Sequence, residues 1–206
     1  MGRTQTFDTN EVVRAARAVF WEHGYESAAL PDLEKATGLS RSSIYHAFGS
    51  KRGLFDAAVA SYLDEVVRPP LRQLASDDAT PDALDRYLLG LRDALQHAGS
   101  GAAMNGCLLI SAANAPIARD DTVARTIDAY AAELRTAVVS GIARQLPDLP
   151  TDQRDTLATA CAGLVIAALS LVRVNLTAAV ASLDAARDLV RSHERAAQPR
   201  EPAPLG

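Results

Sequence analysis

The sequence has few cysteines and few aromatic residues, and it lacks a long hydrophobic run. Two cysteines, Cys107 and Cys161, are too few for the disulfide framework of a secreted protein. Residues 1–10 are polar and contain no apolar signal segment. The most apolar run, residues 157–172, is shorter than the roughly 18–20 residues that span a bilayer, and it stops at Arg173. We therefore expect a cytoplasmic protein with no membrane partner, in which this run forms a buried helix.

Catalytic motifs are also missing. The sequence contains no phosphate-binding loop, dinucleotide-binding glycine motif, serine-nucleophile elbow or zinc-protease helix motif. The histidines are scattered without the spacing of metal ligands. Cys107 and His97 could pair as nucleophile and base, but no third group or oxyanion loop accompanies them. These absences predict a protein that is not an enzyme and has no catalytic residue, metal site or cofactor.

Residues that begin and end helices are frequent, and no alternating strand pattern is found. Aromatic residues make up only 5% of the chain, and a composition rich in Ala and Leu favours helices. Capping residues predict four helices near the N-terminus, the first from Asp8 to Gly24, the second from Pro31 to Gly38, the third from Ser40 to Gly49 and the fourth from Ser50 to the Pro69-Pro70 pair. Further helices are expected from Pro81 and at residues 107–113, 120–145, 151–175 and 182–195, with a flexible break at 97–106. The predicted fold class is all-α.

One short window carries no carboxylate although the whole chain is acidic. The net charge is -4, yet no Asp or Glu occurs between Glu34 and Asp56. Residues 35–55 carry a charge of +4, so the other residues together carry -8. An acidic chain needs a local basic surface to approach a polyanion. The window therefore indicates a nucleic-acid contact.

The same window has the layout of a helix-turn-helix. Gly38 forms the turn between two short helices, and Leu33, Ala36, Ile44 and Phe48 are expected to pack them together. The side chains left outside are polar and none is acidic: Arg41, Ser42, Ser43, Tyr45 and His46. Arg can bind guanine with two hydrogen bonds, and Ser can bond several bases. The N-terminus of the third helix, together with Lys51, is expected to hold phosphates.

This region resembles the N-terminal domain of TetR/AcrR-type regulators over roughly residues 8–56. The resemblance lies in the His23-Gly24-Tyr25 helix end, the Gly38 turn, the Ile44-Tyr45-His46-x-Phe48 pattern and the Ser50-Lys51-x-x-Leu54 pattern. It implies a DNA-binding domain at residues 1–55, with Arg41, Ser42, Ser43, Tyr45 and His46 on the recognition helix and Lys51 on phosphate. It also implies a helical ligand-binding and dimerisation domain at 56–196; residues 197–206 are expected to be a disordered tail. Two departures are Ala28-Ala29, where the family usually has a capping hydroxyl, and Ala47, which replaces a residue that is often polar.

The apolar run bears on the oligomeric state. Residues 157–172 are apolar on every side of a helix, and such a helix must be buried on every side. The resemblance implies a homodimer formed by the last two long helices, and a partner subunit would supply this burial. The alternative is a helix in the core of a monomer.

Ligand-binding or sensing residues are less clearly marked. The Gly-Cys-Leu-Leu segment at Cys107 resembles that of a TetR subgroup, in some members of which the equivalent cysteine senses electrophiles or oxidants; the alternative is a small buried residue. Arg173 could bind an anionic or carbonyl ligand, or it could mark where the helix reaches the surface. Tyr87, Met104 and Tyr130 are candidate pocket walls, although each could equally belong to an ordinary core.

These observations predict a ligand-responsive DNA-binding transcriptional regulator. It would repress as a dimer on a near-palindromic double-stranded operator and be released by an unknown small-molecule or electrophile inducer. Activation instead of repression is equally compatible with the sequence. The alternative function is a helical protein-interaction factor that has lost operator binding, which Ala28, Ala29 and Ala47 favour.

Overall fold

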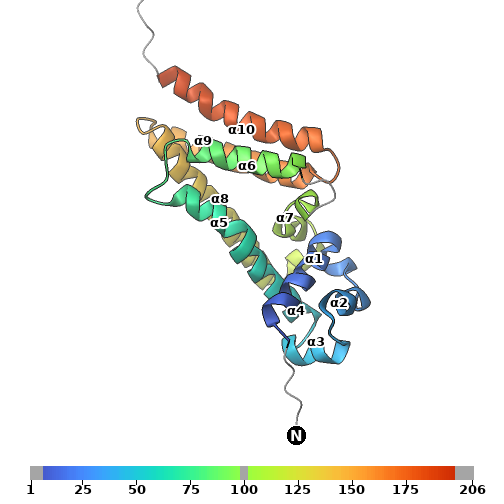
Figure 1. Cartoon of the computed structure of the whole chain (residues 1–206). Helices are drawn as coiled ribbons and strands as arrows, with labels where there is room; N and C mark the ends of the chain where they lie inside the picture. Colours follow the sequence, from blue (N-terminus) through green and yellow to red (C-terminus); the bar gives the residue numbers. More distant parts are fainter. Residues whose placement is uncertain (1–6, 98–101, 198–206) are drawn as a thin grey trace, which may run out of the picture. The chain divides into compact units, whose positions relative to one another are not determined.

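Every regular element in the described part of the chain is helical. The computed structural model describes residues 7–97 and 102–197, and no β-strand occurs among them (Figure 1). This confirms the predicted all-α class. Residues 198–206 of the expected disordered tail and residues 98–101 of the expected break lie outside the described residues; Ala197 ends the last helix, and residues 102–105 form a 3-10 turn.

The helices fall into two compact units. The first unit comprises the chain up to Pro70 together with the segment from Ala98 to Tyr130, and the second comprises Leu71–His97 and the chain from Ala131 onward. The helix α8 contributes its first residues to one unit and the rest to the other. The first unit holds α1 (Thr9–Ser27), α2 (Leu30–Thr37), α3 (Arg41–Phe48), α4 (Lys51–Tyr62), η1 (Leu63–Val67), η2 (Ala102–Asn105), α7 (Leu108–Ala113), η3 (Pro116–Arg119) and the start of α8 (Asp121–Gln145).

The first three helices follow the predicted caps. Asp8 accepts a hydrogen bond from the backbone N–H of Asn10 at the start of α1, and Ser40 accepts one from Ser43 at the start of α3. Gly38 has φ +70°, which is the left-handed conformation that a helix end of this kind requires. The predicted end of the first helix at Gly24 is a kink, after which α1 continues to Ser27.

The prediction that Pro69-Pro70 ends the fourth helix is wrong. The helical backbone passes from α4 through the π-helical turn η1 into α5 (Arg68–Ala75), and both prolines lie in the first turn of α5. An α-helix would bring each proline ring against the carbonyl four residues earlier. The wider η1 turn replaces that geometry, and the N–H of Arg68 donates to the carbonyl of Leu63, five residues back.

The core of the first unit lies under the helix-turn-helix. Leu33, Ile44 and Phe20 are fully buried, and the ring of Phe20 meets that of Phe55 edge-on at 5.2 Å. Ala36, which was expected to join this core, is exposed. The packing fixes α2 and α3 against α1 and α4, so the outward face of α3 has a defined orientation.

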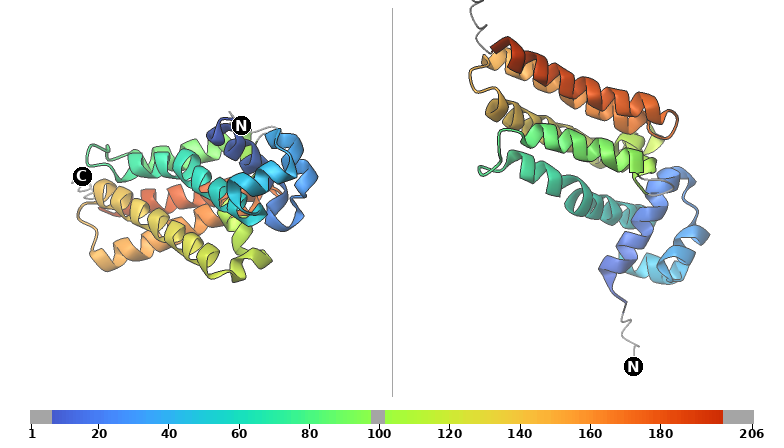
Figure 2. Two further views of the ribbon diagram at one scale, coloured as in Figure 1. Left: turned by 90° about the horizontal axis from the view of Figure 1, so that it is seen from below. Right: turned by 45° about the horizontal axis from the view of Figure 1, so that its top comes forward.

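The second unit is a bundle built around the C-terminal helices. It holds α5 from Leu71, α6 (Ala83–His97), the later part of α8, α9 (Thr151–Leu171) and α10 (Leu176–Ala197). Helix α10 lies along α9 and α6 (Figures 1 and 2), where Arg187 pairs with Asp85 at 2.9 Å. The last helix begins before the predicted residue 182, because the side chain of Asn175 accepts a hydrogen bond from the N–H of Ala178 and caps it.

Helix α9 is not buried on every side within one chain, so the burial expected from a partner subunit stays a prediction. Its buried residues include Leu157, Cys161 and Val165, whereas Ala160 and Gly163 are exposed. Among the described residues, α9 alone is long and apolar enough to cross a membrane; its mean hydropathy is 1.4 and 33% of its most apolar window is buried. A core helix of a soluble protein has the same length and composition.

Candidate DNA-binding surface and ligand pocket

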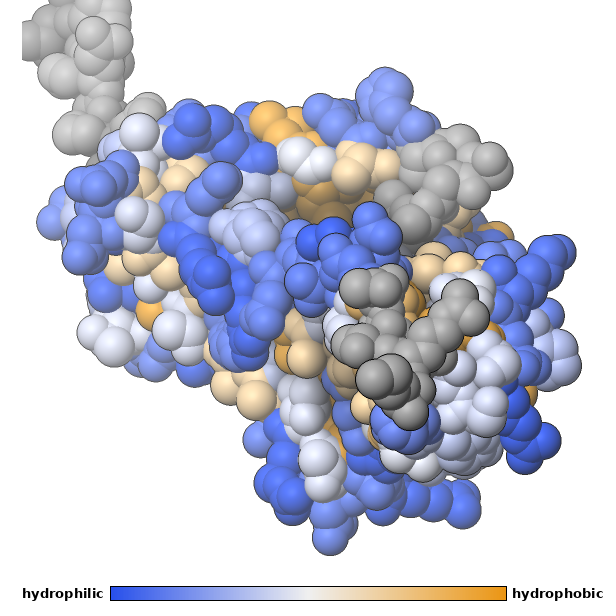
Figure 3. Space-filling view, turned by 60° about the horizontal axis from the view of Figure 1, so that its bottom comes forward, coloured by the Kyte–Doolittle hydropathy of each residue, from blue (hydrophilic) through white to orange (hydrophobic). Residues whose placement is uncertain are grey.

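Helix α3 separates apolar residues on one side from hydrogen-bonding residues on the other. Ile44 is fully buried, whereas Arg41, Ser42, Tyr45 and His46 are exposed. Ser43 is half-buried. The hydrophobic side therefore holds the helix to the first unit and leaves a polar face outward. The face of the molecule drawn in Figure 3 is largely hydrophilic, with hydrophobic residues in small separate patches.

The first turn of α3 is internally hydrogen-bonded. The Ser40 hydroxyl lies 2.9 Å from the Ser42 hydroxyl and 3.0 Å from that of Ser43, in addition to capping the helix. The guanidinium of Arg41 stands 5.6 Å from the centre of the Tyr45 ring, which holds the two side chains together. These contacts orient the outward groups before any ligand arrives.

Glu34 occupies part of the helix terminus that was expected to hold phosphate. Its carboxylate on α2 accepts a hydrogen bond from the backbone N–H of Arg41, one of the donors that an α-helix leaves unpaired at its start. An anion at this end is favoured by the helix dipole. A carboxylate from outside the carboxylate-free window, that of Glu34, therefore bonds to a residue within it.

One of the two departures from the family pattern, Ala28-Ala29, has a structural counterpart. Ala29 precedes α2 without a side-chain hydrogen bond, so the usual capping hydroxyl is missing there.

Lys51, at the start of α4, donates to the carbonyl of Glu26 at 3.5 Å and lies 4.7 Å from the centre of the Tyr25 ring. Burial lowers the pKa of Lys51 from its ordinary value. Its ammonium is thus held against the end of α1.

A second group of contacts ties residues 106–120 to α1 and α4. Trp21 donates from its indole nitrogen to the carbonyl of Gly106 at 2.9 Å, and Glu26 accepts from the N–H of Ile117 at 2.8 Å. Arg52 bridges Asp56 at 2.8 Å and Asp120 at 2.9 Å. The segment before α8 is therefore anchored to α1 and α4, which pack beside α2 and α3.

The Arg52–Asp120 pair also fixes the start of α8. Asp120 accepts hydrogen bonds from the backbone N–H groups of Thr122 at 2.9 Å and Val123 at 3.2 Å, so it caps the helix. The hydrogen bond from Arg52, followed by those backbone bonds, holds the pKa of Asp120 well below its usual range. The pKa of Arg52 is raised by the same carboxylate.

Comparison with known proteins places the chain in a family. The bacterial regulatory proteins of the tetR family match residues 12–58, which contain α2 and α3 whole. Over 194 residues the chain is 31% identical to the uncharacterized HTH-type transcriptional regulator YezE of Bacillus subtilis, covering 94% of this chain and 95% of YezE. This chain belongs to the TetR family. The predicted family is thereby confirmed.

Other TetR-family members and structures resemble the chain over most of its length. The HTH-type transcriptional repressor BdcR of Escherichia coli is 26% identical over 79% of this chain and 80% of BdcR. A cysteine mutant of the TetR-family regulator CifR, solved in complex with 26-bp double-strand operator DNA, has a TM-score of 0.73 and 27% identity over 92% of this chain and 99% of CifR. The reduced form of E. coli NemR shares the fold at a TM-score of 0.69 and 16% identity, covering 88% of this chain and 96% of NemR.

The residues predicted to bind or sense a ligand are divided between the two units. Cys107 and Tyr130 are both buried in the first unit, where the thiol donates to the tyrosine hydroxyl at 3.8 Å. Met104 lies half-buried in η2 of the same unit. Tyr87, on α6, and Arg173, exposed after the end of α9, belong to the second unit. A ligand role for these residues stays a prediction.

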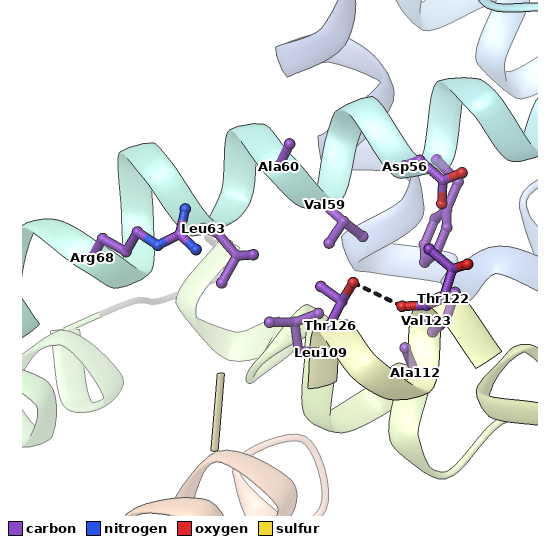
Figure 4. A pocket seen from close by; sticks show the side chains of 11 residues that line it. Asp56, Val59, Ala60, Leu63, Arg68, Leu109, Ala112, Thr122, Val123 and Thr126 are labelled. Carbon is purple, nitrogen blue, oxygen red and sulfur yellow. Dashed lines mark hydrogen bonds between the residues drawn. The ribbon is translucent and has the colours of Figure 1, made fainter. Parts of the chain in front are cut away.

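The structure contains a pocket that sequence reasoning did not find. It has a volume of about 350 Å³ in the first unit, and it lies between α4 with η1 on one side and α7 with the start of α8 on the other (Figure 4). None of the predicted ligand residues lines it. Its lining residues are Phe55, Asp56, Val59, Ala60, Leu63, Arg68, Leu109, Ala112, Thr122, Val123 and Thr126. Arg68, beside the two prolines, is the one lining residue that stands out in the sequence.

Proposed function

We propose that this protein is a ligand-responsive transcriptional repressor that binds a near-palindromic operator as a homodimer. The observation that carries the proposal is the exposed polar face of α3, in the region that the TetR family matches. Residues 1–55 form the DNA-binding domain and residues 56–196 the ligand-binding and dimerisation domain. Such a regulator works in the cytoplasm, has no catalytic role and needs no membrane.

The outward groups of α3 divide between bases and phosphates. Arg41 bonds a guanine edge in the major groove, and the hydroxyls of Ser42 and Ser43 approach neighbouring bases. Tyr45 and His46 contact the backbone or a thymine methyl, and Lys51 holds a phosphate. The contact between Arg41 and Tyr45 supports this assignment because it fixes the direction of the guanidinium.

The exposed side of α9 supports a homodimer. Ala160 and Gly163 are small enough for a second helix to approach closely, and Leu171 and Val174 are 37% and 86% exposed. Dimerisation is typical of this family, and a partner's helices would cover these apolar groups. Two α3 helices about 34–36 Å apart reach successive major grooves, so the operator is palindromic.

Operator binding is tested by gel shift on DNA from the protein's own promoter region. Arg41→Ala should weaken binding roughly ten- to a hundredfold, because a bidentate base contact contributes about 1–3 kcal/mol. Arg86→Ala is the matched control, since it removes an exposed charge that pairs with Asp82 in the second unit. Absence of any shift at low salt, or equal weakening by both variants, would refute the assignment.

Dimerisation is tested by light scattering. Ala160→Arg places a charge on the exposed face of α9 and should give a monomer that no longer binds the operator. Ala132→Arg, at an exposed position on α8, should remain dimeric. A dimer of unchanged mass in Ala160→Arg would exclude this face.

A second candidate function is a protein-interaction factor that has lost operator binding. The uncapped start of α2 at Ala29 and the carboxylate of Glu34 at the start of α3 favour it, because both weaken the grip on phosphate. Salt separates the two functions: operator binding falls steeply with salt as counterions are released, and docking of a protein partner does not.

A further inference from the structure

We propose that the pocket between α4 and α8 binds a small amphipathic carboxylate, with the acid group on Arg68 and an apolar body against Val59, Leu63 and Leu109. Naming this molecule as the inducer rests on the proposed function; the binding site itself does not. The pocket volume, about 350 Å³, is at the small end of the range for small-molecule sites. That size suits a short alkyl or single-ring acid.

Apolar side chains form the body of the pocket. Val59 and Leu63 come from α4 and η1, Leu109 from α7 and Val123 from α8. Leu109 is 1% exposed, and the other three are also buried in the folded chain. An apolar chain or ring packed against these side chains is removed from contact with water and needs no hydrogen-bond partner. This burial of apolar surface is the main contribution of such a pocket to affinity.

Charged residues of opposite sign, Asp56 and Arg68, line the two ends of the pocket (Figure 4). Asp56 at one end is bound by Arg52 at 2.8 Å, and Figure 4 shows it beside Thr122, away from Arg68 at the other end. Arg68 is 31% exposed and pairs with Asp64, which is 59% exposed, at 2.6 Å. Exposed pairs of this kind contribute little stability, and a guanidinium has five donors in a fork that matches a carboxylate. An anionic group is therefore favoured at the Arg68 end, because the Arg68 guanidinium is the cationic group that lines the pocket.

The polar groups between these ends are weak selectors. Thr126 donates its hydroxyl to the carbonyl of Thr122 at 2.9 Å, so its proton is already used within α8. Its oxygen can still accept one hydrogen bond. The pocket thus offers one strong anion-binding group and an apolar interior, which specifies the ligand class as a monoanion with an otherwise apolar body.

Two walls of the pocket are connected to α3 through α4. Thr122 and Val123 follow Asp120, which Arg52 holds to α4, and α4 begins directly after the turn that follows α3. The opposite wall includes Leu63 in η1, a π-helical turn of the kind often found at functional sites. A ligand that separates α4 from α8 therefore strains the Arg52–Asp120 pair and moves the start of α4 relative to α3.

Isothermal titration calorimetry on the full chain without DNA tests the site, with octanoate as the probe and 1-octanol as its neutral counterpart. Wild-type protein should bind octanoate at least tenfold more tightly than octanol. Arg68→Met keeps the length of the side chain but removes its charge, and it should remove that preference. Arg72→Met, one helical turn further along α5 at an exposed position, should bind both probes as the wild type does. Ala112→Phe should fill the apolar part and weaken both probes tenfold or more.

The results separate the pocket from the proposed function. No octanoate binding by wild type, no preference over octanol, or equal loss in Arg68→Met and Arg72→Met overturns the site. If octanoate binds with the expected pattern but leaves the operator-bound fraction unchanged in a gel shift, its role as inducer is overturned. If the ligand-free protein fails to bind any operator, the proposed function fails, and the calorimetry still decides the pocket.

Discussion

Replacing Gly53 by alanine tests how tightly α3 and α4 are fitted to one another. Gly53 lies in the first turn of α4, where its N–H donates to the Ser50 hydroxyl at 3.0 Å. A Cβ atom built on Gly53 would lie 2.0 Å from the backbone carbonyl oxygen of Phe48, and real Cβ atoms essentially never come within 3.0 Å of another heavy atom. Because the obstacle is backbone, a side-chain rotation cannot relieve it.

The expected magnitude follows from two opposing effects. In an open helix, Gly→Ala stabilises by about 0.5–1 kcal/mol. Overpacking ordinarily costs about 1–3 kcal/mol, and a contact as short as this one belongs at the upper end of that range. The net loss is therefore about 2 kcal/mol, which corresponds to a fall in melting temperature of about 4–8 °C for a chain of this size.

Thermal unfolding and operator binding measure the two consequences. Gly53→Ala should melt lower and should also bind the operator more weakly, since relief of the clash moves α3 relative to α4. Gly90→Ala on α6 is the matched control: its Cβ meets nothing within 4 Å, so its melting temperature should rise slightly and its operator affinity should not change. If the two variants shift the melting temperature in the same direction, the packing argument is wrong.

Two further predictions concern the thiols and the Arg52–Asp120 pair. Both cysteines are buried and burial raises the pKa of the Cys161 thiol to about 11, so native protein at pH 8 should show no thiol that reacts rapidly with N-ethylmaleimide, and urea-unfolded protein should show two. One fast thiol in native protein that disappears in Cys107→Ser would contradict this expectation and support Cys107 as a sensor. The lowered pKa of Asp120 means that its stabilising contribution is present above its unfolded pKa, about 3.9, and is lost only as the pH falls through the lower folded value. The melting temperature difference between wild type and Asp120→Asn should therefore stay constant from pH 7 to pH 5 and shrink below about pH 4, where the unfolded chain takes up a proton that the folded chain does not; a difference that stays constant down to about pH 3 would show that Arg52 does not lower the pKa of Asp120.

The start of the chain could be predicted because its signals are local. Asp8 and Ser40 cap helices through hydrogen bonds that span two or three residues, and Gly38 adopts the backbone conformation for which glycine is suited. Each of these signals acts within one turn of helix, so no knowledge of the tertiary structure is needed to find it. The polar outward side of α3 follows from the same short-range pattern.

The errors in the predicted helix ends arise where the backbone geometry differs from the one that the sequence rule assumes. Proline is expected to end a helix, yet Pro69 and Pro70 are accommodated because the preceding turn is π-helical rather than α-helical. The start of α10 was placed too late because Asn175, which caps it, was assigned to the end of the preceding helix. In both cases the residue types are clear in the sequence, but the geometry of the neighbouring turn, which decides their effect, is not.

The pocket could not be found from the sequence because it depends on pairing between distant segments. Arg52 and Asp120 are 68 residues apart, and Val59 and Leu109 look like ordinary buried residues of two amphipathic helices. Nothing in either segment specifies which neighbour it meets. The predicted ligand residues follow from side-chain chemistry and, for Cys107, from a resemblance to a TetR subgroup. Neither signal specifies a position in space, and the residues are divided between two units.

The carboxylate of Glu34 places a fixed negative charge at the start of α3. A DNA phosphate arriving at this end of α3 would find the Arg41 N–H already hydrogen-bonded to a carboxylate, and that negative charge would repel it, so the phosphate would gain less there than at an open helix terminus. Under the proposed function, random DNA, which offers only phosphates, should therefore be bound less strongly. Sequence-specific DNA should lose little, because its additional affinity would come through base edges contacted by the proposed reading residues of α3.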